Sequence, residues 1–189
     1  MCHLAGSFDL GTLGATPVQL PPDTPRLRFR ELSLDDLDFV AAMLADPEVM
    51  RYYPKCYSRD EAVQWIGRQL DRYRDHGHGL WLVLDRSAGH AIGQVGLCQQ
   101  TVDGTPEPEV GYLVHRPFWR RGYATEAATA VRNFAFSVLN RPRVISLIRP
   151  ENTPSQGIAR KLGMQIEKQT LHSGLTHLVF AVCRHATSA

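Results

Sequence analysis

The sequence contains few cysteines and no long apolar run, and both absences narrow what the protein can be. Its four cysteines are far apart and form no C-x-x-C pair, which argues against a disulfide framework and a zinc site: Cys2, Cys56, Cys98 and Cys183. No apolar run approaches the roughly 18 residues that cross a bilayer, and the N-terminus lacks the basic and apolar regions of a signal peptide. We therefore expect a reduced, cytoplasmic protein without a bound metal or a membrane anchor.

The sequence also lacks an excess of charge of one sign. Its 189 residues include 21 basic and 19 acidic residues, which give a formal net charge of +2. A protein that binds the phosphate backbone of DNA or RNA would carry a strong basic excess, and the arginines between positions 116 and 121 form too short a patch to replace it. A nucleic-acid-binding module is therefore disfavoured, whereas the 43% share of hydrophobic residues indicates a domain with a packed core.

Prolines concentrate near the N-terminus and divide the chain into two parts. Pro17, Pro21, Pro22 and Pro25 disfavour a regular element there, because proline lacks a backbone N–H and fixes φ. We expect residues 1–24 to form a flexible leader and residues 25–189 to form one domain without an internal repeat.

Hydrophobic periodicity predicts an alternation of strands and helices within that domain. Apolar residues recur at helical spacing after Ser33 and after Ser58, and Ser58 forms an S-x-x-E capping box with Glu61. Two more helices are expected, over about 125–139 and from Thr153 to Gly163. Strands are expected over 26–30, 80–84, 91–98, 110–114, 144–148, 165–170 and 175–183. This order predicts one mixed α/β domain.

The segment from Glu109 to Ala127 carries the first functional signal. An apolar strand runs into a turn at Gly122 and directly into a helix, so that unpaired backbone N–H groups and the positive end of the helix converge. Such a site suits a phosphate, which Gly122 and Ala124 allow to approach the backbone closely. The segment has neither the G-x-x-x-x-G-K-[ST] nor the G-x-G-x-x-G pattern, so alone it is as compatible with an ordinary tight turn.

A second motif follows the next predicted strand. Its residues lie at the beginning and at the end of one predicted helix. The residues of the two motifs are Val110-Gly111-Tyr112-Leu113, Trp119-Arg120-Arg121-Gly122-Tyr123-Ala124-Thr125-Glu126-Ala127, Asn152, Ser155 and Lys161-Leu162-Gly163-Met164. Together they resemble the GNAT superfamily of acyl-CoA-dependent N-acetyltransferases, and within it the RimJ/RimL-like branch. The resemblance covers residues 25–185. It implies an α+β fold with a single mixed, mostly antiparallel central sheet flanked by helices.

The resemblance implies that acetyl-CoA is the co-substrate and that backbone groups form most of its binding site. The pantetheine arm would pair with the central strand, and the pyrophosphate would lie on the amides of the glycine turn, with arginine side chains within reach of the phosphates. The implied cofactor-binding residues are Leu113, Val114, His115, Arg120, Arg121, Gly122, Tyr123, Ala124, Thr125, Asn152 and Arg160. Arg120 replaces a glycine that is frequent in the family, which puts the shape of the first half of the turn in doubt.

The implied reaction is the attack of an amine on a thioester, which requires an acid for the departing thiolate. Ala159 stands where many GNAT enzymes have a tyrosine acid, so that group is absent here. The RimJ/RimL-like branch implies Ser155 as the acid instead, with Asn152 orienting either Ser155 or the cofactor. A structural role for Ser155 at the start of the helix is the alternative.

The reaction also requires a donor to the oxyanion and a base for the proton of the amine. The backbone amide of Leu113 or of Val114 is the expected oxyanion donor. Glu109, at the start of the central strand, is our first choice for the base, and its rivals are Glu151 and a water-relayed proton. Glu126 lies near the helix start, where a carboxylate favours a capping or structural role.

The acceptor amine is less defined by the sequence. Residues 49–57 join the first two helices and contain three tyrosines, and in the family this loop borders the acceptor site. We therefore expect Tyr52 and Tyr53 of this loop, together with Trp81, which could line the same cleft, to bind the acceptor, which is a protein N-terminus or a small-molecule amine. The alternative is that these aromatic side chains only cover the edge of the sheet. A transferase that uses another acyl-CoA such as succinyl-CoA, and a catalytically silent acyl-CoA-binding domain, are the alternatives. A monomer and a homodimer are both compatible with the sequence.

Overall fold

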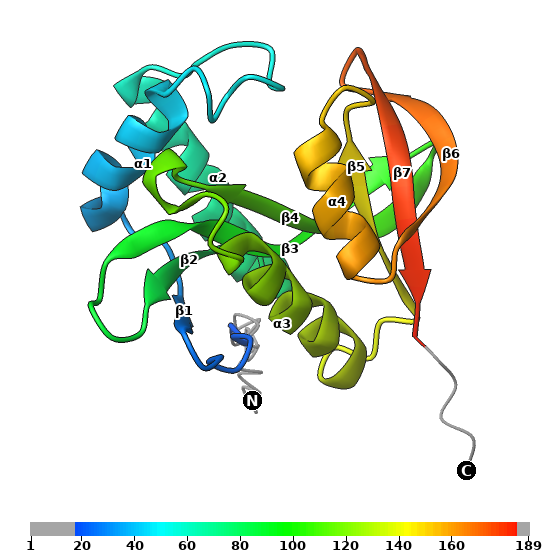
Figure 1. Ribbon diagram of the computed structural model, residues 1–189, viewed down its shortest axis with the longest axis horizontal. Coiled ribbons are helices and arrows are strands. Elements are labelled where there is room, and N and C mark those ends of the chain that lie inside the picture. Colours follow the sequence, from blue (N-terminus) through cyan, green and yellow to red (C-terminus); the bar gives the residue numbers. More distant parts are fainter. Residues whose placement is uncertain (1–17, 185–189) are drawn as a thin grey trace, which may run out of the picture.

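The computed structural model of the chain describes residues 18–184, which form a seven-stranded sheet with helices on both sides (Figure 1). The helices are α1 (Leu37–Ala45), α2 (Arg59–His76), α3 (Tyr123–Ser137) and α4 (Thr153–Lys161). The strands are β1 (Leu27–Arg30), β2 (Leu80–Asp85), β3 (Ala91–Val102), β4 (Thr105–Val114), β5 (Arg143–Ile148), β6 (Gln165–His172) and β7 (Leu175–Cys183).

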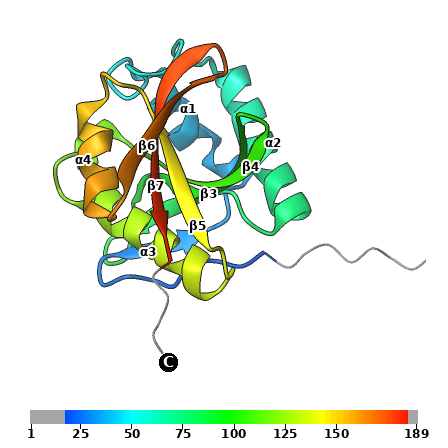
Figure 2. The same ribbon diagram turned by 90° about the vertical axis from the view of Figure 1, so that its right-hand side faces the viewer.

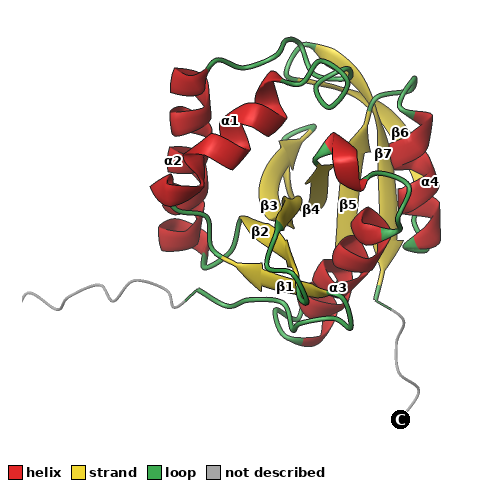
Figure 3. Cartoon of the chain, turned by 60° about the vertical axis from the view of Figure 1, so that its left-hand side comes forward, coloured by secondary structure: helices red, strands yellow, loops and turns green. Residues whose placement is uncertain are grey.

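The sheet is mixed, with the strand order β1-β2-β3-β4-β5-β7-β6, and only the β4–β5 pair is parallel. Helices α1 and α2 lie on one face and α3 and α4 on the other (Figure 3). The side chains agree with this arrangement, because the indole of Trp65 in α2 donates to Gln94 while Phe134 of α3 packs edge-on against Trp81 from the other face. The predicted mixed, mostly antiparallel sheet is confirmed.

The helix ends follow the sequence signals. The hydroxyl of Ser58 accepts a hydrogen bond from the Glu61 N–H, and the Glu61 carboxylate accepts one from the Ser58 N–H, so the predicted capping box is present. Helix α2 ends at Gly77, whose φ of +72° is the left-handed conformation that glycine adopts without strain. Pro154 lies in the first turn of α4, where its missing N–H would have had no partner in the helix.

The β3–β4 hairpin is longer than the sequence predicts. Its turn consists of Asp103 and Gly104, with φ of +49° and +80°, and pairing continues through Pro106 and Pro108. The N–H of His115 donates to Ile92 on β3, so alternate residues of β4 turn their backbone groups away from β3, the two prolines among them. These prolines therefore interrupt no hydrogen bond between β3 and β4.

The tip of this hairpin contacts β6, at the side of the molecule that faces the viewer in Figure 2. The carboxylate of Asp103 accepts a hydrogen bond from the Thr170 hydroxyl at 2.6 Å and pairs with Lys168 at 2.6 Å. A small apolar cluster of Val102, Ile145 and Val179 is buried nearby. These contacts close one end of the sheet and fix the start of β4 against β5 and β7.

Part of the expected leader packs on the domain. The N–H of Gln19 donates to the Gly77 carbonyl at 3.2 Å, Pro21 is buried, and the hydroxyl of Thr24 donates to Glu126 at 2.6 Å. Residues 1–17 of that leader lie outside the described residues. Within residues 18–184, no helix is long and apolar enough to cross a membrane, and no group of three metal-ligating side chains comes together.

The thiol of Cys98 provides a simple test of the packing on the sheet. Cys98 is 4% exposed, and desolvation raises the pKa of its thiol to about 12, whereas Cys56 and Cys183 are exposed. Because the thiolate is the reactive form, we expect an aromatic disulfide reagent at pH 8 to modify Cys56 and Cys183 quickly and Cys98 only after unfolding in guanidinium chloride. Peptide mass mapping identifies the modified residues. Rapid modification of native Cys98 would contradict the packing described here.

Candidate active site

Strands β4 and β5 separate after a single paired position, and this separation opens the candidate site. Glu109 pairs with Ile145, and the hydroxyl of Ser146 donates to the Val110 carbonyl at 2.7 Å, but no further pair joins the two strands within the described residues. Because backbone groups alternate along a strand, the N–H and C=O of Tyr112 and Val114 face the gap. The β4 strand therefore offers an open edge to a second extended chain.

The backbone groups of the two expected oxyanion donors, Leu113 and Val114, face opposite sides of β4. Leu113 is paired with Gln94 on β3, and its carbonyl oxygen lies so close to Gly93 that a Cβ there would approach it to 2.3 Å. The backbone of Leu113 is thus committed to β3, as is the N–H of His115, whereas the amide of Val114 faces the gap. The carbonyl of Val114 accepts a hydrogen bond from the Trp119 indole at 2.6 Å.

The glycine turn follows directly at the end of β4. Gly122 has a φ of +82° and precedes α3, and Arg120 also has a positive φ, of +60°. The amides of residues 121–125 have no hydrogen-bond partner within residues 18–184, and they lie at the positive end of a 15-residue helix. Arg120 thus adopts a left-handed conformation that glycine takes without strain and that costs a residue with a Cβ about 1–2 kcal/mol.

The N-terminal segment supports this turn from outside. The guanidinium of Arg26 donates to the Glu126 carboxylate at 2.6 Å and to the Arg121 carbonyl at 3.0 Å, and it stacks on the Tyr123 ring with 4.7 Å to the centroid. Partial burial alone would raise the pKa of Glu126, but hydrogen bonds from Thr24 and Arg26 outweigh it and hold that pKa below its usual value. Glu126 is therefore a structural residue here, as its position near the helix start predicts.

Ser155 and Asn152 lie at the start of α4, on the face of the sheet that bears α3. The side-chain oxygen of Asn152 accepts a hydrogen bond from the Ser155 N–H at 3.2 Å, which makes Asn152 the N-cap of the helix. The hydroxyl of Tyr112 on β4 donates to the Ser155 carbonyl at 2.8 Å. This bond joins β4 to α4 beside the gap, and the hydroxyl of Ser155 has no protein partner within residues 18–184.

Glu109 lies on the opposite face of the sheet, at the point where β4 and β5 part. Its carboxylate accepts hydrogen bonds from the Gln100 side chain at 2.7 Å and from the Leu147 N–H at 3.2 Å. Desolvation raises the pKa of Tyr112, and the negative charge of Glu109 raises it further.

Comparison with known proteins agrees with this geometry. The acetyltransferase (GNAT) domain model matches residues 26–165. The YkkB protein of Bacillus subtilis is 31% identical over 150 residues, which are 79% of this chain and 87% of the relative. An acetyltransferase from Agrobacterium tumefaciens aligns with a TM-score of 0.74 and 25% identity over 97% of this chain and all of that one. RimL, a ribosomal L7/L12 α-N-protein acetyltransferase solved with coenzyme A, shares the fold at 12% identity, with a TM-score of 0.70 over 87% of this chain and 98% of its own.

The chain belongs to the GNAT family of acetyltransferases. The predicted family, fold and enzyme class are confirmed, since the family model covers most of the domain and the structural neighbours share its sheet. The motifs from which the resemblance was inferred lie at the open edge of β4, at the glycine turn and at the start of α4.

The prediction that Trp81 binds the acceptor is wrong. Trp81 is completely buried and packs against Phe134 of α3, with 5.8 Å between ring centroids. Alternation along β2 places it on the face opposite Glu109, in the main core, so it lines no acceptor cleft. Tyr52 is half-buried and Tyr53 is 37% exposed, and both remain in the loop between α1 and α2.

Arg160 is placed differently from the other two predicted phosphate arginines. Arg120 and Arg121 flank the glycine turn and are exposed, whereas the Arg160 guanidinium donates to Gln156 at 3.2 Å and stacks over the Phe180 ring. The structure therefore brings Arg120 and Arg121 to the turn and holds Arg160 on the surface that α4 shares with β7.

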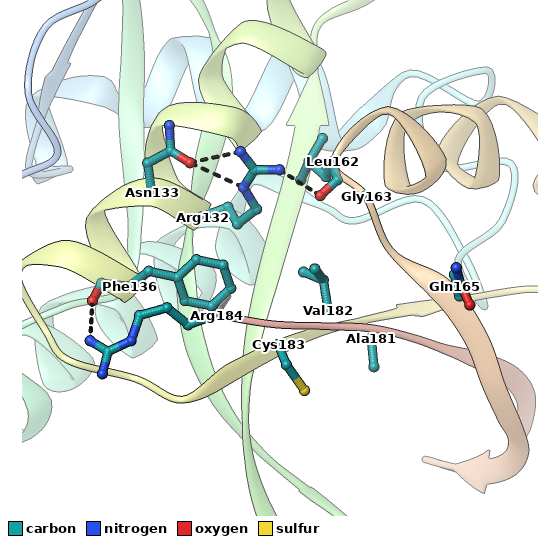
Figure 4. A pocket seen from close by; sticks show the side chains of 10 residues that line it. All are labelled: Arg132, Asn133, Phe136, Leu162, Gly163, Gln165, Ala181, Val182, Cys183 and Arg184. Carbon is teal, nitrogen blue, oxygen red and sulfur yellow. Dashed lines mark hydrogen bonds between the residues drawn. The ribbon is translucent and has the colours of Figure 1, made fainter. Parts of the chain in front are cut away.

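The acetyltransferase also has a groove at the other end of α3, drawn in Figure 4. It has a volume of about 610 Å³ and is lined by residues of the last turns of α3, the end of α4 and the end of β7. Its two arginines already serve the fold, because Arg132 donates to the Leu162 carbonyl at 2.6 Å and Arg184 donates to the Phe136 carbonyl at 3.0 Å. The groove is lined by none of the residues of the glycine turn.

Two residues on the same face of the sheet as Glu109 are not among the predicted site residues, Gln100 on β3 and His177 on β7. Gln100 lies beyond the end of the strand predicted over 91–98. Only the greater length of β3 in the structure brings it opposite the start of β4. His177 had a usable signal, because alternation along 175–183 places it on one face with Val179 and Ala181, where a polar residue is unexpected.

The bond between Tyr112 and Ser155 gives a test of how the acetyltransferase positions its acid. We expect Tyr112→Phe to lower kcat several-fold and to destabilise the fold by about 1 kcal/mol, since one hydrogen bond to a half-buried carbonyl is lost. Steady-state kinetics and thermal unfolding measure the two effects. Tyr57→Phe, in the loop between α1 and α2, is the control and should change neither by as much. Unchanged kcat in Tyr112→Phe would exclude this positioning role.

Proposed function

We propose that the enzyme transfers the acetyl group of acetyl-CoA to a primary amine by direct attack in a ternary complex. The observation that supports this proposal most is the continuity of two unsatisfied backbone surfaces, the open edge of β4 and the free amides of the glycine turn. One fits an extended amide-bearing arm and the other fits a pyrophosphate, which are the two parts of coenzyme A joined in that order. RimL, with the same fold, has been solved with coenzyme A.

Binding would rest on backbone groups of this chain. The amides of residues 121–125 would donate to the pyrophosphate, and the positive end of α3 would stabilise its charge. The N–H and C=O of Val114 would pair with the pantetheine arm across the gap, so that the Trp119 indole would share or release the Val114 carbonyl. Arg120 and Arg121 are placed to add charge at the phosphates.

The catalytic groups would lie on both sides of the gap. A backbone N–H of β4 that faces the gap, at Val114, would donate to the oxyanion, and the Ser155 hydroxyl would give its proton to the departing thiolate. Glu109 would bind the ammonium of the acceptor beside the thioester, and either this carboxylate or a group next to it would take the proton. Asn152 would hold Ser155 through the cap of α4.

Calorimetric titration with acetyl-CoA, succinyl-CoA and free coenzyme A tests the first half of the proposal. We expect acetyl-CoA to bind with micromolar affinity. If succinyl-CoA bound more tightly than acetyl-CoA, the transferred group would be succinyl and not acetyl. Thiol release from acetyl-CoA is then measured with a panel of amines: a peptide with an N-terminal serine, a peptide with an N-terminal alanine, tyramine and spermidine. Binding without amine-dependent thiol release would leave a silent acyl-CoA-binding domain, and no binding would refute both functions.

A further inference from the structure

We propose that the imidazole of His177 is the base that takes the proton from the acceptor ammonium, an inference that rests on the proposed acetyl transfer. Glu109 then binds the ammonium and holds it beside the thioester. His177 lies on β7, two strands from Glu109, and it does not belong to either motif from which the family resemblance was inferred.

The sheet register places His177 and Glu109 on the same face. Glu109 pairs with Ile145, and Ile145 pairs with Ala181, so the side chains of these three residues point to one face of the sheet. Alternation along β7 puts His177 on that face as well. The Glu109 carboxylate reaches along the gap to the Leu147 amide, and Leu147 pairs with Val179, only two residues from His177. Neighbouring strands lie about 4.8 Å apart and alternate residues about 6.7 Å apart, so the Cα atoms of Leu147, where the carboxylate is bound, and of His177 are about 8 Å apart.

A hydrogen bond fixes which nitrogen of His177 is free. Its Nδ1 lies 2.9 Å from the carbonyl oxygen of Leu175. A carbonyl oxygen can only accept, so Nδ1 carries the proton and Nε2 holds the lone pair of the neutral ring. The Nε2 atom has no hydrogen-bond partner within residues 18–184. The ring is further oriented by His172 of β6, which packs edge-on at 5.9 Å between centroids.

The charged groups around His177 favour its neutral, basic form. Burial lowers the pKa of His177 below its ordinary value, and the nearby His172 of β6 and Arg149 after β5 act in the same direction, whereas the Leu175 hydrogen bond and the charge of Glu109 oppose this. Because Ile148 pairs with Leu178, the next residues along the two chains, Arg149 and His177, lie opposite each other. This position explains the effect of the Arg149 guanidinium on the pKa of His177. The imidazole is thus unprotonated at neutral pH and can accept a proton.

The carboxylate of Glu109 is less suited to that task. Both of its oxygens already accept hydrogen bonds, one from Gln100 and one from the Leu147 N–H, and these bonds fix the carboxylate in place. Each oxygen therefore keeps only part of its accepting capacity for an incoming proton, whereas the fixed negative charge still attracts an ammonium. Glu109 thus supplies a fixed charge that binds the ammonium, and His177 supplies a neutral base that takes its proton.

The proposed proton path balances as follows. The acceptor R–NH3⁺ gives one proton to Nε2 of His177, and the lone pair of the resulting amine forms the C–N bond to the thioester carbon. The C–S bond then breaks, and its electron pair leaves on sulfur. The second proton lost by the nitrogen replaces the one that Ser155 donates to the thiolate. The products are the acetylated amine, the free thiol of coenzyme A and an imidazolium, which returns its proton to water.

The test compares His177→Gln with His90→Gln, the same change at an exposed histidine in the turn between β2 and β3. The measured quantities are acetyl-CoA affinity by calorimetry and kcat/KM for thiol release between pH 5 and 9, with the fastest amine of the panel. We expect His177→Gln to keep the affinity, to lower kcat/KM by about 100-fold at pH 7.5, and to lose the fall in log kcat/KM that the wild type shows as the pH drops below the lowered pKa of His177, which lies below the ordinary value of about 6.5. His90→Gln should stay within a few-fold of the wild type and keep that fall.

Chemical rescue separates a lost base from a structural defect. Added imidazole should restore part of the activity of His177→Ala and should not affect His90→Ala. A wild-type pH profile in His177→Gln, or equal losses in the two glutamine variants, would overturn the role of His177 and leave acetyl transfer standing. Failure of the wild type to release thiol with any amine would refute the proposed function itself and this inference with it.

Discussion

Replacing Gly122 by valine should abolish acetyl-CoA binding. Gly122 has a φ of +82°, and a residue with a Cβ pays about 1–2 kcal/mol or more in that conformation, so the turn would move. The movement would redirect the amides of residues 121–125, and each hydrogen bond to a charged group contributes about 1.5–3 kcal/mol. Loss of two such bonds weakens binding by at least about 100-fold, which calorimetry with acetyl-CoA measures directly.

A second glycine provides the control for backbone strain alone. Gly104 in the β3–β4 turn has a φ of +80°, and no atom lies within 4 Å of the point where a Cβ would stand, so Gly104→Val imposes a comparable strain at the opposite end of β4. We expect both variants to lose thermal stability by similar amounts and only Gly122→Val to lose acetyl-CoA binding. Full affinity in a folded Gly122→Val variant would show that the phosphates do not lie on this turn.

The parts of this site that depend on local backbone geometry could be predicted from the sequence. A strand followed by Gly122 and a helix determines where free amides converge, whatever the rest of the fold does. The capping box at Ser58 and the cap at Asn152 are equally local, since each joins residues within one turn. The structural role of Glu126 near the start of α3 is predictable in the same way. Its partners Thr24 and Arg26 are about 100 residues away in the sequence, so only the structure identifies them.

The parts that depend on which face of the sheet a residue occupies could not be predicted in this way. Trp81 stands in a continuous apolar run, whose pattern does not show which side faces the core and which the cleft, and the structure buries it under α3. The proximity of His177 to Glu109 requires the order β4-β5-β7, in which β7 lies between β5 and β6. That order is a property of the whole fold, and no local signal in 175–183 indicates it.

Replacing Ser155 by alanine should lower turnover and leave binding of acetyl-CoA nearly unchanged. The substitution keeps the Ser155 N–H that Asn152 caps and the Ser155 carbonyl that accepts from Tyr112, so α4 stays in place. Only the hydroxyl is lost. An acid contributes about 10²–10⁴-fold to a rate, and a thiol with a pKa near 8.5 is a good leaving group, so we expect kcat to fall near the lower end, by about 100-fold.

Thr153→Ala, in the same first turn of α4, is the matched control for this prediction. Thr153 is exposed and also carries a hydroxyl, so a fall in kcat that reflects only the loss of a hydroxyl at the start of the helix would appear in both variants. A fall confined to Ser155→Ala would assign the proton donor to that side chain, because the two variants leave the same backbone behind. Normal turnover of Ser155→Ala would mean that the thiolate leaves without an acid from this chain, with water as its proton donor.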